Sequence, residues 1–179
     1  MPARVIADPD PRALGDLTRK SSFPPVVAPD TRVLILGSLP GERSLAERRY
    51  YAHPQNRFWH LVGGVIGSDL SALDYDARLA ALLAARIGLW DVVGSARRSG
   101  SLDAAIREAQ PNALAALVAG LPTLRAVGFN GATAARIGAA LLAGTGPELV
   151  RLPSSSPAYA AMRSDEKARR WAALREYLR

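Results

Sequence analysis

The sequence predicts an α/β fold, a three-layer α/β/α sandwich built around a central four-stranded parallel sheet. Four short apolar runs alternate with helical patterns, which is typical of a parallel sheet with helices on both faces. The strand exits are rich in Gly, Ser, Asn, Asp and Pro, and 179 residues with 49% hydrophobic side chains can bury a substantial core. We therefore expect one domain over residues 32–179, preceded by an irregular arm at residues 1–31.

The arm is rich in proline and has no hydrophobic period, whereas the rest of the chain is patterned. Strands are predicted at residues 33–36, 87–93, 124–129 and 148–152. Helices are predicted at about residues 56–66, 76–86, 103–109, 113–119 and 132–143, and from about residue 165 onward. Gly67 should end the first helix, Pro111 should separate the two short ones, and Ser164 should cap the last. Residues 38–54 are polar and turn-rich, which predicts a long loop of the kind that often carries function.

The composition narrows the classes of function. A formal charge of +7 and a pI of about 10.5 favour a polyanionic partner, although arginine-rich chains are often basic for other reasons. Cysteine is absent and the only histidines are His53 and His60, so we expect no disulfide, metal site, iron–sulfur cluster or other cofactor. No apolar stretch reaches the ~20 residues that span a bilayer, and the N-terminus lacks the apolar core of a secretory peptide. We expect a monomeric, cytoplasmic protein with no membrane partner.

In folds of this kind the functional site lies at the carboxyl ends of the strands. The four predicted exits are residues 37–41, 91–95, 128–131 and 153–157. The first, GSLPG, has glycines at both ends, so its backbone could approach a ligand closely or could simply form a turn. It lacks the Lys-Ser/Thr pair of phosphate loops and the third glycine of dinucleotide fingerprints. Ser44, farther along the loop, could cap a turn or contact a phosphate.

The far end of this loop carries aromatic and amide groups. Tyr51 is the second of two adjacent tyrosines, and it could stack on an extruded base, an interaction of ~1–3 kcal/mol, or only anchor the loop. Asn56 could be the N-cap of the next helix, or its amide could orient a water or bond a base edge. Asp91 ends an apolar strand, where a carboxylate is costly unless it pairs with Arg97 or Arg98 or belongs to a working site.

The last exit holds three serines between Pro153 and Pro157. On its own this segment is a rigid turn, but beside DNA its donors could seat phosphates and it could fill the gap left by a flipped nucleotide. Arginines that flank the exits could neutralise phosphates or be ordinary solvated charges, and they are Arg97, Arg98, Arg151 and Arg163.

Together these residues resemble the uracil-DNA glycosylase superfamily. GSLPG, ten residues and then AHPQNRFW is similar to the first motif of mismatch-specific uracil glycosylases, in which Gly-Ile-Asn-Pro-Gly precedes an Ala-His-Pro segment at the same spacing. The hypoxanthine-DNA glycosylase branch is more similar still, with Gly-Ser-x-Pro, a Tyr-Tyr pair, Asn-x-Phe-Trp and a late Pro-Ser-x-Ser-Pro. The strand Leu89-Trp90-Asp91 and the RSGSLD segment at residues 98–103 also look like that branch, and the similarity covers roughly residues 30–179.

Two positions depart from the superfamily pattern. Leu39 stands where most members place a catalytic Asp, Asn or Glu, and Leu152 stands where the second motif opens with His or Asn. The hypoxanthine branch also lacks both groups, and the resemblance implies that it relies on the Asn of Asn-x-Phe-Trp, here Asn56. Asp91 falls near the position at which uracil-specific relatives read the base with Asn, and a carboxylate there could accept from a base N–H.

The resemblance implies a monofunctional DNA glycosylase that flips a deaminated base, hypoxanthine in the first instance, out of double-stranded DNA and hydrolyses its N-glycosidic bond, starting base excision repair. Its catalytic residues would be Asn56, which positions the water, and Asp91, as base or electrostatic stabiliser. The base-binding residues would be Gly37, Ser38, Leu39, Pro40, Gly41, Tyr51 and Phe58. The residues in contact with DNA would be Ser44, Ser154, Ser155, Ser156, Pro157, Ala158, Tyr159 and Arg163. No lysine lies in these motifs, so water is the expected nucleophile and the DNA strand should stay intact.

Three other functions remain open at this point. One is a uracil-specific or mismatch-specific DNA glycosylase. Another is a relative that binds DNA lesions without catalysis, which the leucines at positions 39 and 152 favour. The third is a small-molecule phosphate binder, and salt-sensitive binding to duplex DNA would count against it.

Overall fold

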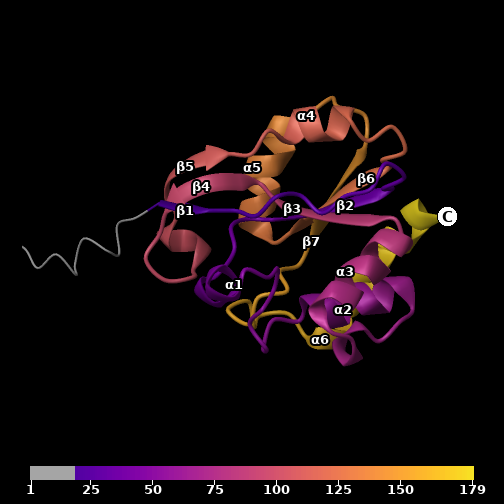
Figure 1. Ribbon diagram of the computed structural model, residues 1–179, viewed down its shortest axis with the longest axis horizontal. Coiled ribbons are helices and arrows are strands. Elements are labelled where there is room, and N and C mark those ends of the chain that lie inside the picture. Colours follow the sequence, from indigo (N-terminus) through magenta and orange to yellow (C-terminus); the bar gives the residue numbers. More distant parts are fainter. Residues whose placement is uncertain (1–18) are drawn as a thin grey trace, which may run out of the picture.

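The computed structural model describes residues 19–179. At its centre lies a parallel sheet with the strand order β3–β2–β6–β7 (Figure 1), made of β2 (Val33–Gly37), β3 (Ile87–Asp91), β6 (Ala126–Asn130) and β7 (Glu148–Leu152). Every residue of β2 and β6 is buried, because these strands occupy the middle of the sheet and both of its faces are covered. The predicted four-stranded parallel sheet is confirmed.

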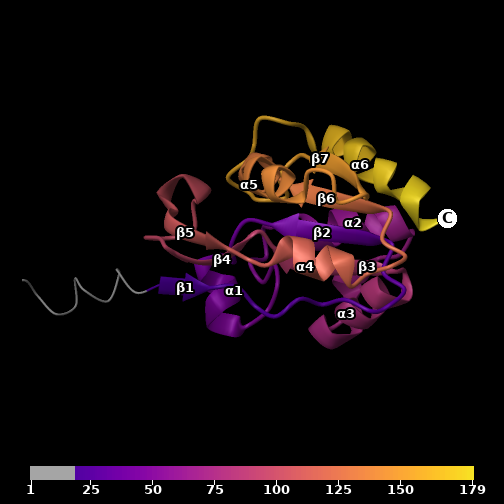
Figure 2. The same ribbon diagram turned by 90° about the horizontal axis from the view of Figure 1, so that it is seen from above.

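Helices cover the two faces of this sheet (Figures 1 and 2). On one face the core around Val33 and Ile35 is completed by α2 (Phe58–Ile66), α3 (Tyr75–Ala84) and α6 (Ser164–Ala172), which a 3-10 helix extends over Ala173–Leu178. On the other face the core around Leu34 and Leu36 is completed by α4 (Leu114–Ala119) and α5 (Ala132–Leu142). Alternate side chains of one strand therefore enter two separate cores, as the pleat requires. The predicted three-layer sandwich is confirmed.

A second sheet, antiparallel and not predicted, lies beyond the carboxyl ends of the first (Figure 1). Its strand order is β1–β4–β5, with β1 (Arg19–Ser21), β4 (Val93–Arg97) and β5 (Arg107–Pro111). The strand predicted at 87–93 is therefore two strands, since the chain passes at Val92 from one sheet to the other. The helix predicted at 103–109 is wrong, because only Asp103–Ala105 forms a 3-10 helix and β5 follows. Every residue of β5 is exposed, so no buried apolar pattern signals this strand.

Part of the predicted arm is regular structure. β1 pairs with β4 in an antiparallel register that sets Arg19 opposite Arg97. Val26 exchanges two backbone hydrogen bonds, of 2.9 and 2.8 Å, with Leu89 of the edge strand β3. The expectation of an irregular arm is therefore wrong for β1, because backbone pairing requires no side-chain period. The arm's residues 1–18 lie outside the described part of the chain.

The helix ends follow local signals, with small shifts. α2 begins at Phe58 rather than near Asn56, and Gly67 ends it as predicted, with a left-handed φ of 75°. α6 begins at Ser164 itself and Arg163 takes the cap position, so the predicted cap is displaced by one residue.

The long loop predicted at 38–54 contains a short helix, α1 (Glu42–Glu47). It ends where Arg48 adopts a left-handed backbone, with a φ of 53°. Only Ser44 of this helix is buried, so no apolar stripe predicts it.

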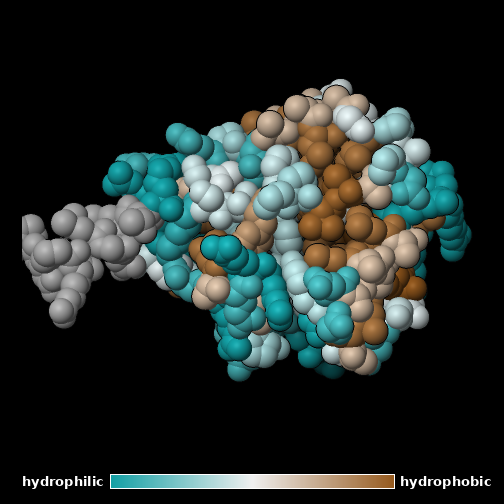
Figure 3. Space-filling view, in the orientation of Figure 1, coloured by the Kyte–Doolittle hydropathy of each residue, from teal (hydrophilic) through white to brown (hydrophobic). Residues whose placement is uncertain are grey.

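Figure 3 shows hydrophilic side chains over the β1–β4–β5 end of the molecule and a hydrophobic band between α4 and α3. Within residues 19–179 no helix is long and apolar enough to cross a membrane.

α5 packs closely on the sheet at Gly138, where a Cβ would stand 2.3 Å from Cε1 of Phe129 and 2.9 Å from Cγ1 of Val92. We expect Gly138→Ala to lower the free energy of unfolding by about 1–3 kcal/mol, because overpacking outweighs the gain in helix propensity. Gly64→Ala in α2 is the matched control, since a Cβ there meets nothing within 4 Å, and it should raise stability by about 0.5–1 kcal/mol. Urea denaturation compares the two, and changes of the same sign would contradict the packing argument.

Candidate active site

The register of the parallel sheet brings its four carboxyl ends together. Gly37 of β2 stands opposite Asp91 of β3, and Asn130 of β6 stands opposite Leu152 of β7. Backbone hydrogen bonds continue past the strand ends, from the N–H of Val92 to the carbonyl of Gly37 at 2.8 Å. Side chains that follow the strands therefore meet at one edge, as in other open α/β sheets.

Asp91 is the buried carboxylate of this edge. Its side chain is 4% exposed, and its Oδ2 has no hydrogen-bond partner among the described residues. Burial raises the pKa of Asp91 to about 7, while the positive charge of Arg98 acts in the opposite direction. Asp91 forms an ion pair with neither Arg97 nor Arg98. Arg97 binds Glu108 at 3.0 Å, and the Arg98 guanidinium donates to backbone carbonyls. An acid of this kind can exist in either protonation state near neutral pH.

Arg98 holds the GSLPG segment in place. Its side chain is 1% exposed and donates to the carbonyls of Leu39 at 3.3 Å, of Gly100 at 2.8 Å and of Pro40. Burial of the guanidinium costs solvation, which lowers the pKa of Arg98, and the nearby carboxylates of Asp103 and Asp91 partly offset that cost. The predicted first motif is thus a rigid turn whose carbonyls face a buried cation.

Gly37 allows two side-chain oxygens to lie close to its backbone. A Cβ at this position would stand 2.7 Å from Oδ1 of Asp91 and 2.9 Å from the hydroxyl of Tyr51, so both oxygens lie against bare backbone. The ring of Tyr51 stacks on Phe58, with 3.8 Å between ring centroids and 11° between planes. Tyr51 adopts a left-handed backbone with a φ of 53°, which is uncommon for an aromatic residue and typical of strained functional loops.

Asn130 joins the aromatic pair to the serine segment. Its Oδ1 accepts from the backbone N–H of Ser155 at 2.9 Å, and its Nδ2 donates to Ser155 Oγ at 2.9 Å and to the Tyr51 hydroxyl at 3.2 Å. Because a backbone N–H can only donate, this contact fixes which end of the amide faces Tyr51. The group that Asn130 presents to the site is therefore a donor.

Asn56 lies where the loop, α2 and the serine segment meet. Its Oδ1 accepts from the backbone N–H of Phe58 at 2.9 Å, so it caps the helix although it is not the residue directly before it. The next residue, Arg57, donates its backbone N–H to the carbonyl of Ser155 at 3.0 Å. Asn56 is half-buried, and a carbonyl oxygen has a second lone pair with which to accept from a water.

Comparisons with known proteins agree with this arrangement. A model of the "Uracil DNA glycosylase superfamily" matches residues 24–178. The chain belongs to the uracil DNA glycosylase superfamily. Two relatives named hypoxanthine DNA glycosylase are 45% identical over 113 residues (Methanosarcina barkeri; 63% of this chain, 72% of the relative) and 43% identical over 139 residues (Methanosarcina acetivorans; 78% and 87%). The solution NMR structure of a candidate uracil DNA glycosylase from Methanosarcina acetivorans superposes with a TM-score of 0.81 at 40% identity, covering 90% of this chain and 99% of that one.

Within this superfamily fold, the predicted base-binding residues divide into two groups. Gly37, Tyr51 and Phe58 meet in the stack over the strand ends. Ser38 donates its hydroxyl to Oδ1 of Asp103 at 2.6 Å, whereas Leu39 and Pro40 are buried against Arg98. Gly41 precedes α1 as its cap residue.

The residues predicted to contact DNA also fall into groups, which differ in their exposure. Ser44 and Ser155 are 6% and 1% exposed, and Ser44 Oγ accepts from the backbone N–H of Ala52, so their burial argues against direct phosphate contacts. Ser154 and Ser156 are half-buried and accept from backbone N–H groups within their own turn. The exposed members are Pro157, Ala158, Tyr159 and Arg163.

The sequence did not single out Asn130 or the buried role of Arg98. Asn130 lies in a predicted strand exit, but Asn before Gly131 has the ordinary composition of a turn. Its burial, at 9% exposure, and its bonds across the sheet depend on residues 25 and 79 positions away. Among residues 19–179 no group of three or more His, Asp or Glu side chains is arranged to hold a metal ion.

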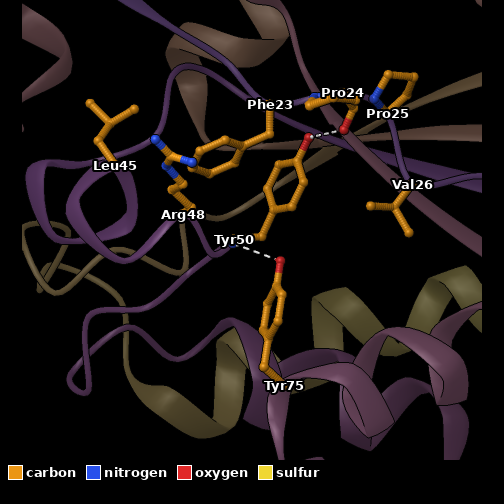
Figure 4. A pocket seen from close by; sticks show the side chains of 8 residues that line it. All are labelled: Phe23, Pro24, Pro25, Val26, Leu45, Arg48, Tyr50 and Tyr75. Atoms are coloured by element: carbon orange, nitrogen blue, oxygen red, sulfur yellow. Dashed lines mark hydrogen bonds between the residues drawn. The ribbon is translucent and has the colours of Figure 1, made fainter.

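A cavity of about 480 Å³ lies beside the preceding tyrosine, Tyr50 (Figure 4). The Tyr50 hydroxyl donates to the carbonyl of Pro24 at 3.0 Å, and its backbone N–H donates to the Tyr75 hydroxyl at 3.0 Å. The cavity is lined mainly by apolar side chains and by Arg48, and it includes none of the predicted site residues. Tyr50 is therefore the anchor of the loop, while Tyr51 faces the strand ends.

Ionisation of Asp91 should make the fold less stable as the pH rises. Burial raises the pKa of Asp91 to about 7 in the folded protein, so the folded state keeps a proton that the unfolded chain loses above about pH 4. Between about pH 5 and about pH 8, wild-type stability should therefore fall relative to that of Asp91→Asn by on the order of 2–3 kcal/mol. Urea denaturation at both pH values measures this difference.

Asp69→Asn provides the control of opposite sign. Hydrogen bonds from Ser71 lower the pKa of Asp69, so the stability that this carboxylate contributes should be lost only as the pH falls through that lowered pKa. Parallel pH profiles for wild type and Asp91→Asn would contradict the raised pKa of Asp91.

Proposed function

We propose that the protein is a monofunctional DNA glycosylase that releases hypoxanthine from deoxyinosine in double-stranded DNA. The observation that carries the proposal is the identity of 43% and 45% to two relatives named hypoxanthine DNA glycosylase. The strand-end cluster supports it, because a buried carboxyl group, a fixed amide and an aromatic stack are groups that can bind and orient a flipped base.

In the proposed reaction the deoxyinosine rotates out of the duplex, which costs less than for a normal base because its pairing is weaker. The aromatic rings of Tyr51 and Phe58 and the backbone from Gly37 to Gly41 receive the base. The C1′–N9 bond then stretches towards an oxocarbenium-like state and its electron pair passes to the base. A water oxygen bonds to C1′, and the proton that the water loses balances the one that the departing base takes up. The products are free hypoxanthine and an abasic site in an intact strand.

Asn56 is proposed to position the water. Its place at the junction of α2 and the serine segment puts an amide beside the aromatic stack, and its capped geometry keeps that amide fixed. Asp91 is the second catalytic candidate. Its buried carboxyl group, with an unpartnered oxygen, could stabilise positive charge on the sugar or assist the water when ionised.

The proposed DNA-binding surface is the exposed segment that follows the serines. Pro157, Ala158 and Tyr159 are placed to fill the gap left by the flipped nucleotide, and Arg163 to contact a phosphate. A formal charge of +7 supports a polyanionic partner. As parts of the same proposal, the protein acts as a monomer on duplex DNA and works in the cytoplasm.

With duplex oligonucleotides that carry a single lesion, we expect release of hypoxanthine from deoxyinosine and a product strand that breaks only after alkali and heat. The strand should survive because Lys20 and Lys167 are the only lysines, Lys167 donates to the carbonyl of Tyr159, and neither belongs to the proposed catalytic or base-binding residues. Chromatography of the released base and gel analysis of the strand measure both expectations, with undamaged duplex as control. Faster release of uracil would favour a uracil or mismatch glycosylase, and tight lesion binding without release would favour a non-catalytic relative.

Replacement of Asn56 should separate its two roles. Asn56→Ala should lower kcat by about 100-fold or more if the amide positions the water, and should cost about 1 kcal/mol of stability because the helix cap is lost. Asn56→Ser is the control, since serine keeps a capping oxygen without the amide, and it should recover stability but not activity. Single-turnover kinetics and thermal denaturation measure the two effects. Full activity of Asn56→Ala would show that the water is positioned elsewhere.

A further inference from the structure

The chain between β7 and α6, which includes the serine segment, is fastened to α6 at two points (Figure 1). Near its start, the indole N–H of Trp171 donates to the carbonyl of Pro153 at 2.9 Å. Farther along, the ammonium group of Lys167 donates to the carbonyl of Tyr159 at 2.6 Å. Lys167 and Trp171 are four residues apart in α6, so they lie on one face of the helix and hold the chain from the same side.

Lys167 is buried, which is rare for a lysine without a carboxylate partner. It is 6% exposed, and within residues 19–179 it forms no ion pair. Loss of solvent around the ammonium group lowers the pKa of Lys167, and the positive charge of Arg57 acts in the same direction. An apolar side chain of similar length would avoid this desolvation. Stability of the fold therefore does not account for a lysine at this position.

The side chain of Lys167 holds Tyr159 by its backbone and by its ring. Besides the hydrogen bond to the carbonyl, Nζ lies 5.0 Å from the centroid of the Tyr159 ring, a cation–π contact. The backbone N–H of Tyr159 donates to the carbonyl of Ser156 at 3.1 Å, so the turn before it is fixed as well. Tyr159 nevertheless stays 39% exposed. An exposed aromatic residue in a fixed position can fill a gap in DNA without first being ordered.

We propose that Lys167 is a positioning residue, which holds Tyr159, and with it Pro157 and Ala158, in the conformation that enters the gap left by the flipped nucleotide. The inference rests on the proposed function and adds to it the residue that preorganises this gap-filling segment, residues 157–159. Lys167 acts through Tyr159 rather than on the DNA or the base. Because the segment is already ordered, less of the free energy of binding is lost when it enters the duplex.

Such a role matters only where there is a gap to fill. In a paired duplex the flipped nucleotide leaves a space in the base stack, and the nucleotide returns unless a protein group occupies that space. In an unpaired bubble the damaged base has no partner to rejoin, so extrusion does not depend on a filler. Loss of positioning should therefore slow base release from paired DNA far more than release from a bubble, whereas a general defect in folding would slow both equally.

Lys167→Met tests the proposal, because methionine is unbranched and of similar length but carries neither the charge nor the donor. Its melting temperature should equal or exceed that of wild type, since a buried charge without a carboxylate partner is gone. Single-turnover release of hypoxanthine from a paired deoxyinosine duplex should fall by about tenfold or more, because a hydrogen bond from a charged group is lost. Release from the same lesion in an unpaired bubble should stay within about threefold of wild type.

Arg169→Met is the matched control for charge. Arg169 is an exposed cation of the same helix, with 69% of its side chain exposed. Its replacement removes one positive charge from α6 without touching Tyr159, so neither rate should change by more than about threefold.

A binding measurement gives the same test without a chemical step. When a tetrahydrofuran abasic analogue replaces deoxyinosine, the paired duplex already contains the gap. Fluorescence anisotropy should show that Lys167→Met binds this duplex about fivefold or more weakly than wild type does, with unchanged binding to the same strand alone. This comparison decides the matter if wild type releases no base from the bubble.

Equal losses on paired and unpaired DNA would give Lys167 a purely structural role and overturn the proposal. A wild-type rate of Lys167→Met on the paired duplex would overturn it too. If Lys167→Met does not fold, Lys167→Gln replaces it, because the glutamine side chain ends one atom short of the lysine ammonium, and it should show the same selective loss on paired DNA.

Failure of the glycosylase function and failure of the role of Lys167 give different results. If no base leaves deoxyinosine-containing DNA, the glycosylase function fails, and binding to the abasic-analogue duplex still tests Lys167. If hypoxanthine is released but Lys167→Met matches wild type on the paired duplex, the function stands and the role of Lys167 fails.

Discussion

The close approach at Gly37 is the constraint on which the site depends. The register of the parallel strands places Gly37 beside Asp91, and the missing side chain lets the Asp91 carboxylate and the Tyr51 hydroxyl reach bare backbone. One contact thereby couples the rigid sheet to the loop that carries the aromatic stack. Any larger residue at this position would push the two oxygens apart, so the geometry of the site follows from a single glycine and the strand register that positions it.

The site also contains a buried polar group whose burial lowers the stability of the fold. Within residues 19–179, Oδ2 of Asp91 is the buried side-chain polar atom without a partner, and burial shifts its pKa to about 7. A core optimised only for stability would place a neutral apolar residue there. Natural folds retain such groups mainly at functional sites, where the shifted pKa and the unused oxygen are available to a ligand. The same burial that weakens the fold therefore prepares the site.

The sequence predicted what depends on apolar pattern and local motif, and missed what depends on distant partners. The buried strands, and the presence of Tyr51 and Asn56 at the same end of the loop, follow from residues that are close together in the chain. The exposed strand β5 has no such pattern, since backbone pairing with β4 and an ion pair between Arg97 and Glu108 hold it without buried apolar side chains. Asn130 and Arg98 have the residue types of a turn and a surface, and only the folded chain shows that one bridges the loop to Ser155 and the other is buried.

The two leucines that depart from the superfamily pattern acquire a structural explanation. Leu39 is 6% exposed and belongs to the core beneath α4 and α5, where its carbonyl accepts from Arg98. Leu152 is 4% exposed and packs against Gly128. Both positions therefore contribute to the two cores of the sandwich, and a polar group at either would need a buried partner. The polar atoms of the site come instead from Asp91, from Asn130 and from the loop, so apolar residues at those two positions do not by themselves indicate a site that has lost its chemistry.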